Sequence, residues 1–248
     1  MMVRKEFSME IAGFVAAISP QCESTRHYFR EYLTERAPDF SFAVTREAMD
    51  FEQAFSLEEA RQEGIRPRMY DDPHLERAAI QRAFAEYLFD RDVLLLHGST
   101  VALDGKAYLF TAKCGIGKST HTRLWRQVFG QRAVMVNDDK PFLKITPDGI
   151  LACGSPWSGK HGLSSNICVP LQGICILERG AENVIRPFSP AEALPMLLHQ
   201  AYCPVDGEKA AQQRDLVERL AASVALWHMD CTKDPQAAII AHAAMANP

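Results

Sequence analysis

The segment Ala112–Ser119 reads Ala-Lys-Cys-Gly-Ile-Gly-Lys-Ser and matches the phosphate-loop pattern, with alanine in the first glycine position. It follows an apolar segment, 107–111, that is typical of a strand. It precedes a segment with helical periodicity, in which Leu124 and Val128 lie one turn apart. A phosphate loop needs this order, because the helix that follows directs its positive end toward the phosphates. The motif therefore predicts a strand–loop–helix unit of an α/β fold.

Each part of the loop has a physical task. Gly115 and Gly117 allow the backbone to turn so that successive N–H groups point at phosphate oxygens. Lys118 supplies a positive charge to the β- and γ-phosphates, and the Ser119 hydroxyl is a hard oxygen ligand for Mg²⁺. We expect ATP and Mg²⁺ as ligands, with nucleotide contacts along the whole loop: Ala112, Lys113, Cys114, Gly115, Ile116, Gly117, Lys118, Ser119 and Thr120.

Two adjacent acids follow the next apolar strand. Val134–Val136 leads into Asn137 and then Asp138-Asp139. A site that transfers a phosphoryl group needs a carboxylate near the metal and a base near the acceptor hydroxyl, and two acids can divide these roles. An isolated Asp-Asp pair can equally cap a turn, here before Pro141. His97 also ends an apolar run, but taken alone it is more often a structural histidine.

Composition excludes several classes of partner. The formal net charge of the 248-residue chain is −4, so its overall charge gives no electrostatic attraction to nucleic acid or to an anionic membrane. The longest apolar runs are too short to span a bilayer, and the start, Met1 to Glu6, lacks the apolar core of a secretion signal. The seven cysteines are scattered without a Cys-x-x-Cys pair, which predicts reduced thiols in a cytoplasmic protein.

The remaining periodicity predicts a mixed sheet with helices. The charged stretch 59–72 indicates a boundary, which gives a smaller N-terminal α/β lobe over 1–70 and a phosphate-loop domain over 71–248. We expect a helix opened by Asp72-Pro73, with a buried stripe that includes Leu75, Ile80, Phe84, Tyr87 and Leu88. Other strands are predicted at 7–18, 40–46, 93–96, 100–103, 133–136, 141–146, 149–153, 172–178, 183–188 and 223–230. Other helices are predicted at 23–33, from 189 to 202, at 207–222 and at 235–245.

The order of these motifs resembles the kinase domain of HPr kinase/phosphorylase, a family related in fold to the phosphoenolpyruvate carboxykinases. Leu96-His97-Gly98, a hairpin, the phosphate loop and Asp138-Asp139 carry the resemblance, which covers residues 93–145. It implies that one acid of the pair is the base toward an acceptor serine and the other a Mg²⁺ ligand. We assign Asp138 as the base and Asp139 as the ligand, and the opposite order stays open. The resemblance also implies that His97 lies near the phosphates or the acceptor. HPr kinases are hexameric, so the resemblance makes a homo-oligomer plausible.

The chain departs from that family after the acids. HPr kinases carry an Arg-Gly-hydrophobic-Gly signature there, and this sequence has the loop Gly154–Gly162 instead. The Pro-Trp-x-Gly-Lys part of this loop is similar to a shorter branch of HPr-kinase-like proteins. We expect Lys160, with His161, to neutralise charge on the transferred phosphoryl group. Trp157 has two open roles, stacking on a substrate or anchoring the core, and Asn166 and Arg179 are weaker candidates.

The sequence is compatible with three functions. The first is an ATP- and Mg²⁺-dependent kinase acting on a hydroxyl, such as serine, of a protein or peptide. The second is a small-metabolite kinase of the same fold, and the third is a nucleotide-binding regulatory module without turnover. The absence of the Asn-Lys-x-Asp segment that reads guanine disfavours a GTPase. The departure at Gly154–Gly162 argues against HPr itself as the acceptor.

Overall fold

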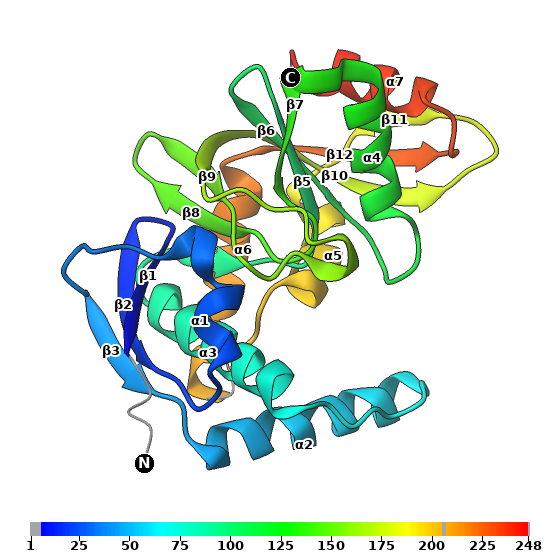
Figure 1. The fold of residues 1–248 in the computed structure, drawn as a ribbon. Coiled ribbons are helices and arrows are strands. Elements are labelled where there is room, and N and C mark those ends of the chain that lie inside the picture. Colours follow the sequence, from blue (N-terminus) through cyan, green and yellow to red (C-terminus); the bar gives the residue numbers. More distant parts are fainter. Residues whose placement is uncertain (1–5, 205–206, 248) are drawn as a thin grey trace. The chain divides into compact units, whose positions relative to one another are not determined.

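The computed structural model describes residues 6–204 and 207–247 (Figure 1). The chain divides into two compact units, Met1–Tyr87 and Leu88–Pro248. This division falls inside one helix, and the boundary expected near residue 70 stays a prediction. Most of the segment from Met1 to Glu6, which was argued to lack a secretion signal, lies outside the described residues. Within the described ranges, none of the helices combines the length and apolar character needed to cross a membrane.

The first unit is a small α/β unit with a three-stranded sheet in the order β1-β2-β3. Strands β1 (Phe7–Ile11) and β2 (Phe14–Ser19) form an antiparallel hairpin, and β3 (Phe40–Ala43) pairs parallel with β2. The prediction of one strand over 7–18 was wrong, because Ala12 and Gly13 take positive φ angles and reverse the chain. The helices are α1 (Ser24–Tyr28), α2 (Arg46–Glu63) and α3 (Asp72–Phe89), with a short 3₁₀ turn at Arg30–Tyr32.

Two buried carboxylates of this unit, Glu76 and Glu52, have partners within it. Glu76 on α3 is fully buried and accepts hydrogen bonds from the Cys22 amide at 3.0 Å and from the Thr25 hydroxyl. Glu52 on α2 accepts from Arg82 on α3 at 2.5 Å, and both side chains are largely buried. A buried charge is tolerated only with such partners, so these bonds fix the helices against one another and against the turn after β2.

The second unit is built on a curled mixed sheet in the order β4-β8-β9-β10-β6-β5-β7, with β12 and β11 continuing from β10. The long strand β10 (Cys168–Arg179) pairs antiparallel with β9 through its first residues and parallel with β6 and β12 through its later ones. The other strands are β4 (Val93–Leu95), β5 (Ser99–Leu103), β6 (Lys106–Thr111), β7 (Ala133–Asn137), β8 (Phe142–Thr146), β9 (Gly149–Cys153), β11 (Val184–Pro187) and β12 (Ala225–Cys231). The predicted mixed sheet is confirmed.

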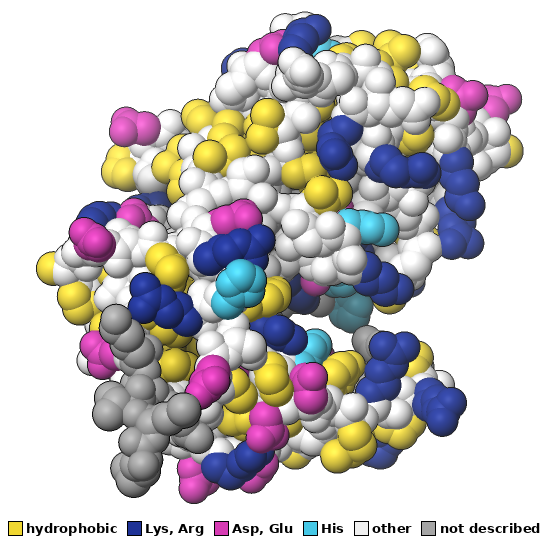
Figure 2. All heavy atoms as spheres, viewed as in Figure 1, with side chains coloured by type: hydrophobic (Ala, Val, Ile, Leu, Met, Phe, Trp, Pro, Cys, Tyr) yellow, Lys and Arg dark blue, Asp and Glu magenta, His cyan; other side chains and the backbone are white. Residues whose placement is uncertain are grey.

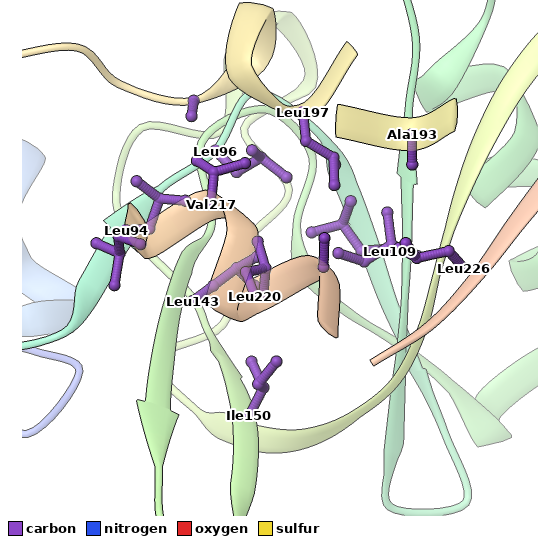
Figure 3. Close-up of a cluster of buried hydrophobic side chains, with 14 of the residues drawn as sticks. Leu94, Leu96, Leu109, Leu143, Ile150, Ala193, Leu197, Val217, Leu220 and Leu226 are labelled. Atoms are coloured by element: carbon purple, nitrogen blue, oxygen red, sulfur yellow. The ribbon is translucent and has the colours of Figure 1, made fainter. Parts of the chain in front are cut away.

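Helices cover both faces of this sheet. On one face, α5 (Pro190–Gln200) and α6 (Ala210–Ala222) bury Leu197, Val217 and Leu220 against strand side chains such as Leu109, as Figure 3 shows. On the other face, α4 (Lys118–Phe129) and α7 (Gln236–Met245) bury a cluster that includes Trp125. Apolar residues on both faces explain why the sequence of the central strands shows continuous runs rather than alternation.

Several local predictions are confirmed. Asp104 and Gly105 both take positive φ angles in the turn between β5 and β6, as a tight hairpin requires. Ser189 and Glu192 form the predicted capping box of α5. The prediction of reduced thiols without a disulfide was wrong, because Cys153 and Cys168 are bonded. They lie directly opposite each other in the β9–β10 pairing, a register that the spacing of cysteines along the chain does not reveal.

Candidate active site

Four strands of the second unit end at the same edge of the sheet. Strands β6, β10 and β12 are parallel neighbours, and β5 is antiparallel to both β6 and β7. The carboxyl ends of β7, β6, β10 and β12 therefore point the same way, and the start of β5 lies among them. In open α/β sheets, ligands bind beyond the carboxyl ends of the strands. This edge carries the predicted phosphate loop after β6 and the two acids after β7.

The predicted phosphate loop is shaped to receive an anion. Gly115 and Gly117 have φ angles of 78° and 129°, a region that side chains other than glycine avoid. Helix α4 begins at Lys118 with neither a side-chain cap nor an acid in its first turn, so its free N–H groups face the loop. Arg179, at the end of β10, donates to the carbonyl of Gly115 at 2.6 Å. A phosphate would satisfy these N–H groups, and the loop fits the group that the sequence predicts.

Lys118 is held under the loop. Its side chain is 9% exposed, and its Nζ donates to the carbonyl of Ala112 at 3.2 Å. Burial lowers the pKa of Lys118, while the neighbouring Asp139 opposes this shift. An ammonium group placed here meets an anion in a partly desolvated site, where charge attraction is stronger than in water.

His97 and Asp139 form a pair beside Lys118. The Nε2 atom of His97 lies 3.2 Å from Oδ1 of Asp139, and the amide of Gly98 donates to the Asp139 carbonyl at 3.0 Å. Burial lowers the pKa of His97, and the hydrogen bond with Asp139 opposes this effect. Burial alone would raise the pKa of Asp139, but the bond from His97 and the positive charges of Lys140 and Lys118 bring it below its ordinary value. Asp139 is therefore a carboxylate at neutral pH.

Asp138 is connected to helix α4 by a chain of hydroxyl groups. Its side chain is 5% exposed, and Oδ1 accepts from the Ser99 hydroxyl at 2.7 Å. The Ser99 hydroxyl also lies 2.7 Å from the Thr122 hydroxyl. Ser99 has one proton and gives it to Asp138, so Thr122 is the donor to Ser99. This chain ties the carboxylate after β7 to the first turns of α4, next to Ser119, whose carbonyl lies 3.3 Å from the Thr122 hydroxyl.

A fully buried asparagine shapes the turn that carries both acids. The Oδ1 atom of Asn137 accepts from the amides of Asp139 and Lys140 at 2.7 and 2.6 Å. Its Nδ2 donates to the carbonyl of Ser155 at 2.8 Å, and the Ser155 hydroxyl donates to the Lys140 carbonyl at 2.6 Å. The side chain of Asn137 thus accepts the backbone N–H groups of the turn in place of a backbone carbonyl, as asparagine side chains commonly do in turns. It also connects the turn to the loop that follows β9.

The loop Gly154–Gly162 packs against the acids. A Cβ atom at Gly159 would lie 3.2 Å from the Cβ of Asp139, so the backbone of Gly159 covers that side chain. Trp157 is buried and packs edge to face with Phe142 at 6.5 Å between ring centres, which favours the core-anchor role over stacking on a substrate. Lys160 follows Gly159 and is exposed, as is His161. The structure therefore brings the predicted basic loop to the Asp139 side of the site.

Gly154 is the tightest position in this loop. A Cβ atom there would lie 1.9 Å from the carbonyl oxygen of Ser165 and 2.7 Å from that of Val136. We expect Gly154→Ala to lower the free energy of unfolding by about 2–3 kcal/mol, which lowers Tm by roughly 5–10 °C. Thermal unfolding measures this effect. Gly207→Ala is the matched control, because a Cβ atom at Gly207 meets nothing within 4 Å. Equal Tm values for the two variants would contradict the packing described here.

His121 lies in the first turn of α4 and is 2% exposed. Its Nε2 accepts from the indole N–H of Trp125 at 3.2 Å, so in the neutral ring the proton is on Nδ1. Nδ1 is buried without a hydrogen-bond partner among the described residues. Burial lowers the pKa of His121 to about 4. The imidazole is therefore neutral at physiological pH, with an unsatisfied buried donor.

Because His121 is buried in its neutral form, we expect the free energy of unfolding to depend on pH. The pKa of His121 is about 4 in the folded chain and 6.5 in the unfolded chain, so between these pH values the unfolded chain binds more protons. The contribution of neutral His121 to the free energy of unfolding is fully present above pH 6.5, and it is lost as the pH falls toward 4. Glutamine does not titrate, so the free energy of unfolding of His121→Gln should not have this pH dependence. Relative to wild type, it should rise by on the order of 3 kcal/mol when the pH is lowered from 7 to 4. Denaturant unfolding at both pH values measures this gain. A difference in stability that does not change with pH would contradict the burial of a neutral imidazole.

The structure brings most of the predicted site residues to one edge. Lys118, Asp138, Asp139 and His97 meet there, and Ser119 begins the helix beside them. Four polar residues that the sequence did not single out also belong to the site: Ser99, Thr122, Asn137 and Ser155. Asn137 carried a usable signal, since an amide between an apolar strand and two acids predicts a side chain that organises a turn. Arg179, a weak candidate from sequence, contacts the loop directly.

Comparison with known proteins assigns the chain to no family. It matches no protein-family model and no curated protein sequence. Among solved structures it is similar to the HPr(Ser) kinase/phosphatase from Coxiella burnetii, with a TM-score of 0.29 and 14% sequence identity. The similarity covers 52% of this chain and 88% of that chain. A similarity with this TM-score and identity carries no conclusion about the family, the activity or the site of this chain.

Proposed function

We propose that this chain is an ATP- and Mg²⁺-dependent kinase that transfers the γ-phosphoryl group to a hydroxyl of a protein or peptide, with serine as the expected acceptor. One observation carries the proposal. A glycine-containing anion loop, a buried lysine and two differently held carboxylates lie at one edge of the sheet. A loop that only bound a nucleotide would need neither the second acid nor its histidine partner. The order of the motifs, which resembles that of HPr kinases, supports the same function.

The residues divide the work as follows. The N–H groups of the loop and Lys118 would hold the triphosphate, and Ser119 and Asp139 would hold Mg²⁺, which supplies positive charge to the phosphates when bound. His97 orients the Asp139 carboxylate through the 3.2 Å contact. Asp138 would act as the base, taking the proton of the acceptor hydroxyl. As the new O–P bond forms, the bond between the γ-phosphorus and the bridging oxygen breaks, and ADP leaves.

A chain of hydrogen bonds suits Asp138 to the role of base. Its carboxylate is held in one orientation by Ser99, which in turn is held by Thr122. A base fixed in this way loses little entropy when the acceptor arrives. Asp139, by contrast, is half-buried beside positive side chains and stays ionised, as a metal ligand must. The two acids therefore have environments suited to different tasks.

Lys160 tests the role of the loop after β9. If its ammonium group stabilises the transferred phosphoryl group, Lys160→Ala lowers kcat by about 10²-fold or more and changes ATP affinity by less than about threefold. Steady-state kinetics and equilibrium binding of ATP measure the two effects. Lys144→Ala, which removes a charge from β8, is the control. Equal losses of kcat and ATP affinity would show that Lys160 binds the ground state instead.

The experiment that tests the function is transfer of a labelled γ-phosphate from ATP into a host lysate. The lysate is separated into protein and small-molecule fractions after incubation. The proposal predicts label in protein, and Asp138→Asn is the control that should abolish it. Label confined to small molecules would establish a metabolite kinase instead. Label in neither fraction, with ATP bound, would indicate a regulatory module without turnover.

A further inference from the structure

A cavity of about 340 Å³ lies beside the predicted phosphate loop. Its walls come from the start of α4 and from the segments that follow β10 and β12. The acids follow β7, which lies beyond β5 on the other side of β6. Along the edge of the sheet, the cavity and the acids are therefore on opposite sides of the loop. The volume is within the usual range of small-molecule sites.

The walls of the cavity combine apolar surface with polar groups and two positive charges. Gly117, Thr120 and His121 line it from one face of the first turn of α4, since residues three and four apart share a helix face. Arg179 and Lys233 add two positive charges, and none of the described residues that line it is an acid. Figure 2 shows Lys and Arg side chains gathered where β10 and β12 end and α4 begins. The cavity therefore favours an uncharged or anionic ligand.

His121 gives a second, independent sign of a ligand. Its Nδ1–H is a buried donor without a partner among the described residues, and the ring lines the cavity. A buried donor that stays unsatisfied costs about 1–3 kcal/mol. Nε2 of His121 already accepts from the indole N–H of Trp125. A flip of the ring that moved Nδ1 to another position would break that hydrogen bond. Nδ1 itself is closed off, so an acceptor in the cavity would satisfy this donor once the ring shifts toward the cavity.

We propose that this cavity is the nucleoside subsite of the same nucleotide, holding its ribose and base. This inference rests on the proposed function, which directs the γ-phosphate toward Asp138 and Asp139. A triphosphate laid over the loop in that direction places its nucleoside end on the far side of β6, where the cavity is. Thr120 and Thr232 offer hydroxyl groups to the ribose, and the planar guanidinium of Arg179 can stack on a base. The cavity, rather than the loop, would then distinguish a nucleotide from an inorganic polyphosphate.

The test compares Mg²⁺-dependent binding of ATP and of inorganic tripolyphosphate by calorimetry. Wild type should bind ATP at least about tenfold more tightly, because only ATP fills the cavity. Thr232→Trp should fill the cavity. It should weaken the affinity for ATP about tenfold or more and change the affinity for tripolyphosphate by less than about threefold. Thr232→Ser is the matched control, since it keeps the hydroxyl that accepts from the Asp234 amide at 3.1 Å. A second blocking variant, Lys233→Trp, starts from an exposed side chain that is safe to replace and should act in the same direction.

The outcomes separate this inference from the function on which it rests. Equal affinity for the two ligands in wild type would refute the subsite while leaving the phosphate loop intact. Equal weakening of both ligands by the blocking variants would refute it as well. If wild type binds neither ligand, the nucleotide site itself is wrong and the subsite is wrong with it. Selective loss of ATP binding in the blocking variants, absent in Thr232→Ser, supports the proposal.

Discussion

Replacing Asp138 by asparagine should abolish phosphoryl transfer while leaving ATP binding intact. The expected loss in kcat is about 10²- to 10⁴-fold, which is the usual contribution of a positioned base. An asparagine has the same shape, and its Oδ1 can still accept from the Ser99 hydroxyl that holds the carboxylate at 2.7 Å. The amide cannot take a proton from the acceptor. Transfer of labelled phosphate and the ATP-dependent rise in Tm measure the two properties on the same protein.

Asp139→Asn is the informative contrast. The two acids are adjacent, but Asp139 is paired with His97 and would bind the metal. Its replacement should raise the Mg²⁺ concentration needed for half-maximal activity, an effect that excess Mg²⁺ partly reverses. Asp138→Asn should show no such rescue. If Asp138→Asn keeps full transfer activity, Asp138 is not the base, and rescue of that variant by Mg²⁺ would exchange the roles of the two acids.

Replacing Lys118 by alanine should remove the effect of ATP on thermal stability. With ATP at about 100 times its Kd, binding stabilises the wild type by roughly 2.7 kcal/mol, which raises Tm by roughly 5–10 °C. Lys118 supplies a buried positive charge under the loop, so Lys118→Ala should leave a shift near zero. Each variant is compared with its own nucleotide-free Tm, because loss of the buried side chain also changes basal stability.

Arg123→Ala is the matched control for Lys118→Ala. It removes one positive charge from an exposed position on the same helix, without touching the loop. It should keep the wild-type shift, since exposed charges at this distance are screened by salt. An unchanged shift in Lys118→Ala would refute the assignment of the phosphate loop. A shift lost in both variants would indicate general electrostatic attraction instead.

Sequence periodicity predicted most elements of the second unit because its strands and helices have strong apolar patterns, and α5 also has a capping box. The phosphate-loop pattern and the acid pair were visible because their residue types stand next to each other in the chain. The Ser99–Asp138 and Asn137–Ser155 contacts were not, because they depend on strand order and on a loop that returns to the sheet. Side-chain partners far apart in sequence leave no local pattern to read.

The first unit shows the opposite case. Helix α2 was not predicted, although Thr45 caps its start and Gly64 ends it in a left-handed conformation. Its buried side includes the charged Glu52, which is paired with Arg82, so the apolar periodicity that marks a helix is weak. The Cys153–Cys168 disulfide was missed for a related reason, since the β9–β10 register brings the two residues together.

The most direct test of the account is a crystal structure with Mg²⁺ and a nonhydrolysable ATP analogue. The triphosphate should lie on the loop between Gly115 and Ser119, with the γ-phosphate on the side of Asp138 and Asp139 and Mg²⁺ bound by Ser119 and Asp139. The nucleoside should lie beside Thr120 and Lys233. A nucleotide bound elsewhere, or bound on the loop with its γ-phosphate directed away from the two acids, would contradict the central claim.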